Sequence, residues 1–310
     1  MIKYIVKRLL LVIPVLIGVN LLVFTVMFIS PSDPAQILLG QNSTPEALEQ
    51  LRSDMGLDKP YVLQYSDYFT KMLQGDFGKS YRNNRDVFQE VTSRLPVTII
   101  LAFFSMCLAM SIGLFVGILS AVKQYTLFDY MSVVFALLFA AIPIFWLAMI
   151  LVMIFSLHLG WLPASGLQGW KSFVLPVVTT GIVLSASVIR MTRSSMLEVI
   201  RQDYIRTIRA KGAEERYVIL KHALRNALLP IITVGGNIFG VLMGGAVVIE
   251  MVFALPGLGL LLVDAVRQQD RPVVLASVTF LAMVFSLINL LVDLLYAVFD
   301  PRIKAQYSSK

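Results

Sequence analysis

Six long apolar runs constrain the fold of this 310-residue chain more than any other feature of its sequence. An α-helix rises about 1.5 Å per residue, so about 20 apolar residues cross the hydrocarbon core of a bilayer. We therefore expect an all-α, polytopic membrane protein with six transmembrane helices. The expected spans are Leu9–Ser30, Val97–Val122, Met131–Leu157, Phe173–Ile189, Leu228–Ile249 and Val273–Phe299.

Composition supports this interpretation over a soluble fold. Hydrophobic residues make up 57% of the chain and charged residues 15%, whereas a soluble domain is nearer half apolar and one quarter charged. The contrast argues against a disordered chain, a nucleic-acid-binding module and most soluble enzymes. The net charge of +7 therefore needs an explanation other than nucleic acid, and its distribution along the chain provides one.

The first apolar run is predicted to be a retained span and not a cleaved signal peptide. Its basic flank, with Lys3 and Arg8, would suit either interpretation. The run is longer than a typical signal core, however, and no small-x-small cleavage site closes it. It ends instead in the turn-forming sequence Ser30-Pro31-Ser32-Asp33-Pro34.

Basic residues outnumber acidic ones in the N-terminal flank, in the Arg190–Arg225 segment and in the tail from Asp300 onward. The long loop over residues 31–96 has more acidic than basic residues. Because Lys and Arg accumulate in cytoplasmic loops, we expect both termini in the cytoplasm and the 31–96 loop outside. The positive charge is thus a signature of topology.

The 31–96 loop is long enough to form a small structured cap, which we favour over a disordered linker. Thr44 is expected to cap a helix over Glu46–Met55, with Pro45 at its first position. Aromatic residues recur further along the loop, at Tyr61, Tyr65, Tyr68 and Phe69.

Gly78-Lys79-Ser80 in the same loop looks like the end of a phosphate-binding loop. The required first glycine is replaced by Leu73, and no apolar strand precedes the motif. We do not expect nucleotide binding there, and the chain has no other candidate Walker motif. ATP use therefore requires a partner protein.

The inside loop at about 200–227 contains two helix-like stretches on either side of Gly212. Glycine readily takes the left-handed conformation that ends a helix. After it, Val218, Leu220 and Leu224 are expected near an apolar face, with charges elsewhere. Such a charged hairpin could bind anionic lipid, or it could be a docking element for a cytoplasmic protein.

The fifth span has glycines four residues apart at Gly236, Gly240 and Gly244, with Gly235 and Gly245 beside them. Small residues at this spacing let helices approach closely. The stripe predicts packing within the subunit, or a seam against a partner subunit or a moving helix.

Few polar groups fall inside the spans. Asp293 lies near the inner end of the last span, where pairing with Arg302 is favoured over a role in a proton relay. His158 and His222 fall on opposite sides of the membrane, and Cys107 is the single cysteine. No metal site and no catalytic constellation is therefore expected. The remaining polar positions are Asn20, Asn237, Asn289 and Glu250.

A series of motifs over most of the chain carries a family resemblance. In order, they are Ser32-Asp33-Pro34-Ala35, Leu39-Gly40, Thr44-Pro45-Glu46, Met55-Gly56-Leu57-Asp58-Lys59-Pro60, Gly75-Asp76-Phe77-Gly78-Lys79-Ser80, the stretch from Asp203-Tyr204 to Gly212, His222-Ala223-Leu224-Arg225-Asn226-Ala227 with Pro230, Glu250-x-x-Phe253-x-x-Pro256-Gly257-Leu258-Gly259, and Asn289-Leu290-x-x-Asp293-x-x-Tyr296-x-x-x-Asp300-Pro301-Arg302. In these residues the sequence resembles the integral-membrane permease subunit of bacterial dipeptide, oligopeptide and nickel ABC importers.

The resemblance implies a type I ABC importer-like fold in a bacterial cytoplasmic membrane. It also implies a second homologous permease, two cytoplasmic ATPase subunits that hold the ATP and magnesium, and an extracytoplasmic solute-binding protein. No cofactor is expected in this chain. The implied organisation is a first span in 1–30, an extracytoplasmic cap loop in 31–96, a five-helix core in 97–300 and a cytoplasmic tail in 301–310.

The resemblance also assigns candidate functional residues. The coupling loop to the ATPase comprises Arg206, Arg209, Ala210, Lys211, Gly212, Glu214 and Arg216. Further motif residues are Glu250, Pro256, Gly257, Asn289, Asp293, Asp300, Pro301 and Arg302. The general importer pattern begins its docking loop with Glu-Ala-Ala, where this chain has Arg206, Thr207 and Ile208. A specific acidic contact to the ATPase is therefore not carried over.

The implied function is binding-protein-dependent import of di- or oligopeptides. Nickel or a metal chelate and glutathione remain open as substrates, because the binding protein sets much of the selectivity. A different class, an ATP-independent channel or proton-coupled carrier, is disfavoured by the scarcity of buried carboxylates and by the charged hairpin.

Overall fold

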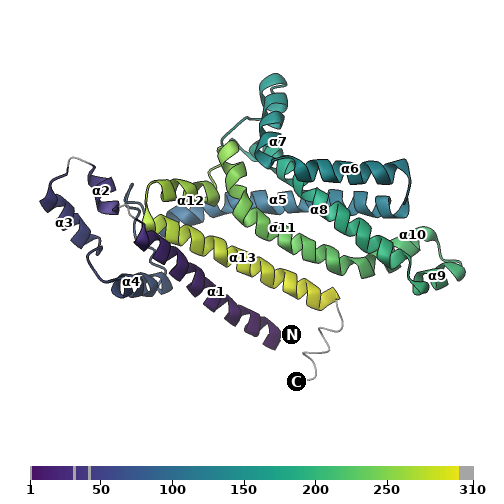
Figure 1. Cartoon of the computed structure of the whole chain (residues 1–310), viewed down its shortest axis with the longest axis horizontal. Helices are drawn as coiled ribbons and strands as arrows, with labels where there is room; N and C mark the ends of the chain where they lie inside the picture. The colour runs from purple at the N-terminus through teal and green to yellow at the C-terminus, as the bar shows by residue number, and fades with distance from the viewer. Residues whose placement is uncertain (1, 31–32, 41–42, 300–310) are drawn as a thin grey trace. The chain divides into compact units, whose positions relative to one another are not determined.

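The computed structural model describes residues 2–30, 33–40 and 43–299 of the chain (Figure 1). In this described part, β structure is limited to an isolated antiparallel bridge between Lys79 and Asp86. The chain forms two compact units. Of the described residues, the core unit comprises 2–6, 99–255 and 287–299, and the cap unit comprises the rest of the described chain between residues 7 and 98 together with residues 256–286.

Five helical segments of the described chain are long and apolar enough to cross a membrane, and a bent helix pair would make a sixth span. This confirms the all-α, polytopic prediction. The five segments are Leu9–Ile29, Val87–Val122, Trp170–Ile200, Glu215–Gly244 and Arg271–Leu294.

The third predicted span, Met131–Leu157, is not one continuous helix. Helix α6 (Leu127–Ala141) and the helical segment Ile144–His158 meet at an angle of 99°. Ile142 and Pro143 between them have extended backbone, with ψ of 127° and 130°. Proline disfavours the helical conformation of the residue before it, so the break follows from a residue that the apolar run conceals. The second segment starts as α7 (Ile144–Leu151) and ends as a π-helix.

The core unit is built around α8 (Val174–Ile200), which packs against α6 and against α11 (Leu224–Val252). Ala136 of α6 and Ala186 of α8 are buried together. Helix α5 (Val87–Val122) also approaches α8 closely, because a side chain at Gly117 would lie 2.6 Å from Cβ of Thr192. Small residues bring these helices together without any requirement for unusual backbone angles.

A buried ion pair joins α6 to α8. Asp129, whose side chain is 2% exposed, accepts two hydrogen bonds from the guanidinium of Arg193, at 2.6 and 2.8 Å. The Ser120 hydroxyl and the Tyr125 backbone N–H donate to the same carboxylate, at 2.5 and 3.1 Å. A carboxylate with this many donors is stabilised in its charged form, so the end of α6 is held firmly against α8.

The cap unit combines two segments that are far apart in the sequence, residues 7–98 and 256–286. It contains most of α1 (Ile2–Ile29), the start of α5 and the first half of α13 (Arg271–Phe299). The shorter helices of the cap unit are α2 (Pro34–Leu39), α3 (Pro45–Asp54), α4 (Tyr61–Leu73) and α12 (Leu258–Arg267). Its apolar core joins α1, α5, α12 and α13, with fully or nearly fully buried residues such as Val91, Leu258 and Val273.

Local capping rules account for the start of α3. The Thr44 side chain accepts a hydrogen bond from the Ala47 N–H at 3.3 Å, and Pro45 occupies the first turn, as predicted. The start of α12 is instead capped by a residue that is distant in the sequence. There the Leu258 N–H donates to the hydroxyl of Thr98, at 2.8 Å.

Candidate functional site

The predicted cytoplasmic loop forms a compact hairpin at one end of the core unit (Figure 1). We call residues 203–223 the hairpin. It consists of α9 (Asp203–Ala210), a turn at Gly212, the short α10 (Glu215–Tyr217) and a π-helical turn over Val218–Ala223 that continues into α11.

Gly212 makes the turn in the way that the sequence predicts. Its φ of 80° lies in the left-handed region that favours glycine. Its N–H donates to the carbonyl of Arg209 at 2.9 Å, which closes the end of α9. No atom lies within 4 Å of the place a Cβ would take, so glycine is needed here for its backbone and not for space.

A bidentate ion pair braces the hairpin across this turn. The guanidinium of Arg209 donates to both carboxylate oxygens of Glu215, at 2.6 and 3.0 Å. These hydrogen bonds raise the pKa of Arg209 above its usual value. Arg209 was expected to contact a partner, but the structure pairs it inside the hairpin. Glu215 was not identified from the sequence, although opposite charges on either side of a turn glycine could have indicated the pair.

Other contacts fix the hairpin to α11. Ile205 is fully buried, and the Asn226 amide donates to the Tyr204 hydroxyl at 2.8 Å. Val218 is also buried, as expected, whereas Leu220 is 48% exposed and therefore contradicts the predicted apolar face. The wider π-helical turn begins at Val218, so positions after it no longer follow the α-helical spacing on which that prediction depended.

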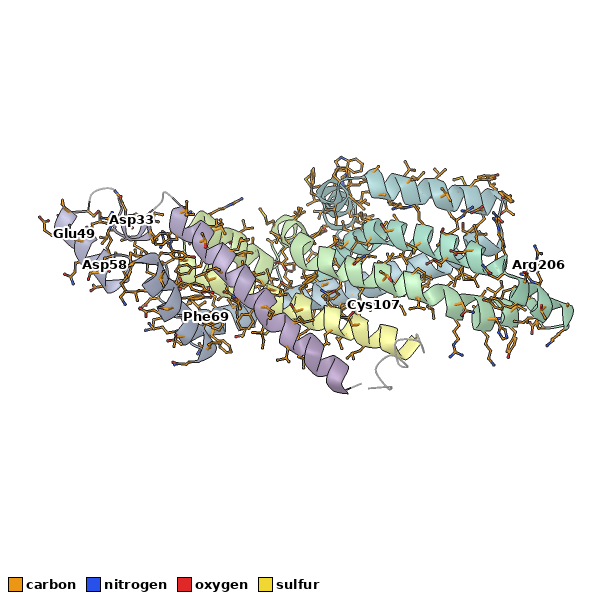
Figure 2. The ribbon with its side chains drawn as sticks, turned by 60° about the horizontal axis from the view of Figure 1, so that its bottom comes forward. Asp33, Glu49, Asp58, Phe69, Cys107 and Arg206 are labelled. Carbon is orange, nitrogen blue, oxygen red and sulfur yellow. The ribbon has the colours of Figure 1, made fainter. Side chains whose placement is uncertain are left out.

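The remaining predicted coupling residues are exposed on the hairpin. Figure 2 labels Arg206 on the hairpin. Its side chain is 75% exposed, and its nearest carboxylate is that of Asp203 at 3.7 Å. A helical hairpin that is anchored on one side and cationic on the other can receive a partner protein. The exposed coupling residues are Arg206, Ala210, Lys211, Gly212, Glu214 and Arg216.

The three glycines of the α11 stripe, Gly236, Gly240 and Gly244, differ in how closely other residues pack against them. A Cβ at Gly236 would lie 2.9 Å from Cγ1 of Val292 on α13, so this glycine permits close packing inside the core unit. Gly240 is half-buried, and Gly244 is exposed with no atom near its missing side chain.

The other motif residues are dispersed. Glu250 is fully buried near the end of α11, while Pro256 and Gly257 form the connection from α11 to α12. Asn289 and Asp293 are half-buried on α13. Three motif residues, and with them the expected pairing of Asp293 with Arg302, lie outside the described residues: Asp300, Pro301 and Arg302.

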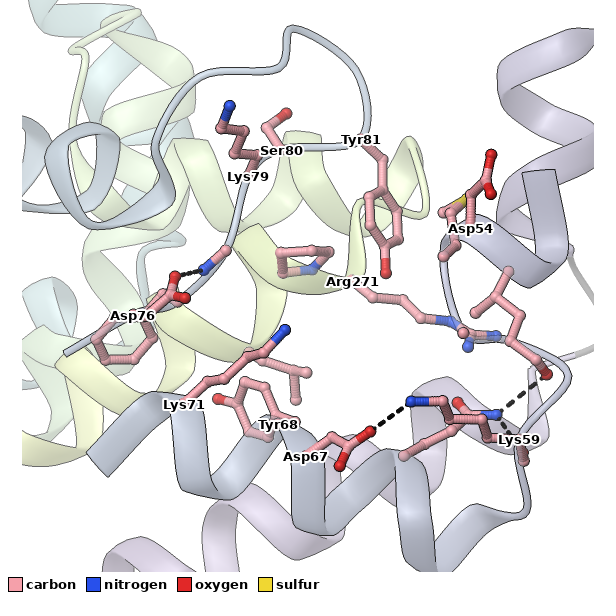
Figure 3. Close-up of a pocket in the computed structure, with 18 of the residues that line it drawn as sticks. Asp54, Lys59, Asp67, Tyr68, Lys71, Asp76, Lys79, Ser80, Tyr81 and Arg271 are labelled. Atoms are coloured by element: carbon pink, nitrogen blue, oxygen red, sulfur yellow. Dashed lines mark hydrogen bonds and ion pairs between the residues drawn. The ribbon is translucent and has the colours of Figure 1, made fainter. Parts of the chain in front are cut away.

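The cap unit contains a cavity of about 650 Å³, which is within the range of small-molecule sites (Figure 3). Lys71 and Tyr81 point toward its middle in Figure 3. Its lining mixes aromatic rings with charged groups of both signs, from α1, α2, α3, the 55–59 connection, α4, the 76–84 loop and the start of α13. The Nε of Arg271, in the same wall, is buried without a hydrogen-bond partner among the described residues.

Asp67 and Tyr68, which line this cavity together with Lys71 of the same helix, have shifted pKa values. Asp67 pairs with Lys59 at 2.7 Å, and this hydrogen bond lowers the pKa of the carboxyl and raises that of the amine. Burial raises the pKa of Tyr68 to about 12. The cavity can therefore offer both cationic and anionic groups to a small polar solute at neutral pH.

The Gly78-Lys79-Ser80 motif forms part of the same wall, and three of its donors already have partners. The Gly78 N–H donates to Asp76 and the Ser80 N–H to the carbonyl of Arg85, at 2.8 and 2.9 Å. The Ser80 hydroxyl donates to Asp270 at 2.5 Å. The structure thus gives this motif a structural role in the loop.

Among the described residues, no group of three or more His, Cys, Asp and Glu side chains could hold a metal ion. His158 is exposed, and its Nδ1 lies 2.8 Å from the carbonyl oxygen of Met153.

Two family descriptions match the sequence. Residues 113–305 match the family described as binding-protein-dependent transport system inner membrane component. Residues 1–102 match the N-terminal region of the corresponding membrane component. Together the two matches cover both units.

Curated relatives align over nearly the whole chain. The dipeptide transport system permease protein of Alkalihalophilus pseudofirmus is 42% identical, over 98% of this chain and 100% of the relative. The glutathione transport system permease proteins of Escherichia coli K12 and Pectobacterium atrosepticum are 42% and 44% identical, each over 98% of this chain and 99% of the relative.

Solved structures share the fold. An inward-facing structure of the MetNI methionine ABC transporter aligns with a TM-score of 0.58 and 21% identity. The alignment covers 68% of this chain and 97% of the solved chain. Since the identity is low, this match supports a shared fold of the transmembrane helices and gives no information on the transported substrate.

Proposed function

Because this chain belongs to the family of binding-protein-dependent transport system inner membrane components, we propose that it is a permease subunit of an ATP-driven importer of di- or oligopeptides. The observation that carries the proposal is the near-complete alignment with a dipeptide permease at 42% identity. The proposed assembly contains a second permease, two cytoplasmic ATPases with ATP and magnesium, and an extracytoplasmic binding protein.

Glutathione is the second candidate substrate, because relatives named for glutathione are equally similar. Both candidates are short peptides with a free amino group and a free carboxylate, so the pathway would accommodate a small charged peptide in either case. Sequence identity does not separate them. Nickel or a metal chelate, the other substrate class open from the sequence, has no support among these relatives.

The hairpin is the proposed coupling element. Its buried Ile205 and the Tyr204–Asn226 hydrogen bond attach α9 to α11. The Arg209–Glu215 pair keeps the two arms of the hairpin together. If an ATPase moved while bound to the exposed cationic side, the hairpin would therefore move as a rigid body and displace α8 and α11 with it. Elements that transmit force in this way need two packed, discrete arrangements.

The proposed orientation has both termini in the cytoplasm, which puts the hairpin on the ATPase side and the 31–96 loop outside. Lys and Arg enrichment in the predicted inside loops supports it. Labelling of single cysteines with a membrane-impermeant maleimide tests the orientation. Cysteine at Glu49 should react in intact cells, and cysteine at Arg206 should react only after lysis. The reverse pattern would refute it.

Gly212 offers the sharpest test of the coupling role. Proline cannot adopt the positive φ of this position, whereas asparagine tolerates it. In proteoliposomes with the full complex, Gly212→Pro should assemble and hydrolyse ATP but lose ATP-driven peptide uptake. Gly212→Asn should keep most uptake. Normal uptake by the proline variant would contradict the proposal.

The energy source and the substrate are tested in the same proteoliposomes. Uptake of radiolabelled dialanine should require binding protein and ATP, and unlabelled glutathione should compete only if it is also a substrate. Uptake driven by a pH gradient alone, without ATP, would instead favour the carrier class.

A further inference from the structure

Helix α4 of the cap unit lies against α1, which is predicted to cross the membrane. Near the start of α4, the Tyr61 ring lies 5.0 Å from that of Phe28. Two turns later, the Tyr68 hydroxyl donates to Oδ1 of Asn20 at 3.0 Å. The contacts of α4 thus move back along α1 by eight residues, which corresponds to about 12 Å of helix.

The extent of the contact between α4 and α1 determines how deep α4 lies in the bilayer. If α4 stood wholly in water, the part of α1 from Asn20 to Phe28 would stand in water beside it. Only Leu9–Val19 would then remain as the apolar span, and it would rise only about 16 Å. The hydrocarbon core is about 30 Å thick. Helix α1 therefore spans the bilayer only if α4 enters the membrane interface with it.

The side chains of α4 divide around its axis in a way that suits this position. Val62, Phe69 and Leu73 are seven and four residues apart and lie on one flank. Val62 is 71% exposed and Leu73 is 70% exposed. Apolar side chains this exposed are unfavourable in water and are stabilised by transfer to an apolar environment.

The opposite flank of α4 is polar. Asp67 and Lys71, four residues apart, line the cap-unit cavity (Figure 3). Between the flanks, Tyr61, Tyr65 and Tyr68 face α1. Tyrosine is enriched at the level of lipid headgroups, where one end of the ring is apolar and the other is hydrated. The two charges of the polar flank cancel, so attraction to anionic lipid is not what would hold the helix there.

We propose that α4 is an interfacial helix, with Val62, Phe69 and Leu73 immersed in lipid and Asp67 and Lys71 facing water. In the orientation proposed above, the lipid belongs to the outer leaflet. The occupant of the apolar flank is the boundary between headgroups and acyl chains, and not a protein. Continuity with the apolar surface of α1 is the reason for this choice, since most side chains of the α1 span are themselves exposed.

Spin labels on single cysteines test the proposal in the full complex, reconstituted in neutral phosphatidylcholine nanodiscs. The background carries Cys107→Ala and has no reactive cysteine in the partner subunits. The test variants are Val62→Cys and Leu73→Cys. The matched controls are Lys71→Cys on the other flank of α4 and Glu49→Cys on α3.

The readout is the collision rate of each label with oxygen, which concentrates in lipid, relative to that with a water-soluble nickel chelate. We expect the oxygen-to-nickel ratio at Val62 and Leu73 to exceed that at Lys71 and Glu49 several-fold. Equal ratios at all four sites would overturn the proposal. Labels at Val62 and Leu73 that neither reagent reaches would also overturn it, because a protein would then cover the flank.

Lipid composition separates the apolar mechanism from an electrostatic one. Adding anionic phosphatidylglycerol, or raising the salt concentration, should leave the ratios unchanged. A high ratio that appears only with anionic lipid would contradict the proposal. Val62→Trp offers an independent check of placement, since its fluorescence should be quenched by brominated acyl chains while that of Glu49→Trp is not.

Discussion

Arg193 on α8 and Asp129 on α6 form a bidentate pair, with the carboxylate 2% exposed and the guanidinium side chain 26% exposed. Replacing one partner leaves the other charge without its counterion in a site that is largely removed from water. Asp129→Asn should therefore destabilise the protein by about 2–3 kcal/mol. Thermal unfolding in detergent measures the loss.

The matched control for this pair is the double variant Asp129→Asn/Arg193→Met, which removes both charges. It should be more stable than Asp129→Asn alone, because no unpaired charge remains. The cycle is completed by Arg193→Met alone. If the stability lost in the double variant equals the sum of the losses in the two single variants, the two side chains have no coupling energy.

Gly236 and Gly244 provide a matched comparison on one helix. Gly236→Ala would bring a Cβ to 2.9 Å from Val292 and should cost about 1–3 kcal/mol through overpacking. Gly244→Ala meets no atom within 4 Å and should be neutral or stabilise α11 by up to about 1 kcal/mol. Chemical or thermal unfolding distinguishes the two.

Relief of the clash is the control for this comparison. Adding Val292→Ala to Gly236→Ala should recover part of the lost stability. If Gly236→Ala alone were as stable as the parent, the close approach of α11 and α13 would be incorrect.

The Arg209–Glu215 brace predicts a charge-reversal rescue. Arg209→Glu places two carboxylates at the turn of the hairpin and should reduce transport while ATP hydrolysis continues. The double variant Arg209→Glu/Glu215→Arg should restore much of the transport, because it rebuilds an ion pair of opposite polarity. Failure of the rescue, with normal assembly, would mean that Arg209 contacts a partner directly.

Tyr68 predicts a pH dependence at the alkaline end. Its pKa of about 12 is raised above the ordinary value of 10, so its contribution to stability is complete below pH 10 and is lost as pH rises through 12. Burial also raises the pKa of Tyr65 and of Tyr81, so absorbance titration at the phenolate band should show several late-ionising tyrosines, of which Tyr68→Phe removes one. Unchanged titration in that variant would contradict the assignment.

The sequence was informative where structure depends on neighbouring residues or on a fixed physical length. Because the hydrocarbon core has a fixed thickness, the lengths of the apolar runs predict the membrane-spanning helices. Thr44 and Pro45 predict the start of α3, and Gly212 predicts the end of α9. The bend at Pro143 was also accessible, because proline restricts the residue before it. The length of the apolar run alone, however, indicates one continuous span.

The pairings between distant residues could not be predicted. Asp129 and Arg193 are 64 positions apart, and nothing in either neighbourhood designates the other as its partner. The register change at Val218 depends on a π-helical turn, which has no distinctive residue pattern. The walls of the cavity come from segments between Phe24 and Leu275, so the cavity exists only once the cap unit has formed.

The Asn20 amide oxygen accepts hydrogen bonds from Tyr68 and from Thr279, and the latter residue is 259 positions later in the chain. A ribosome that adds about 5–20 residues per second needs roughly 13 to 50 s to produce that second donor. During this interval the first helix is already synthesised, with a polar side chain whose final partner does not yet exist. The biogenesis of this protein therefore includes a waiting period, during which lipid, water or the insertion machinery must accommodate Asn20.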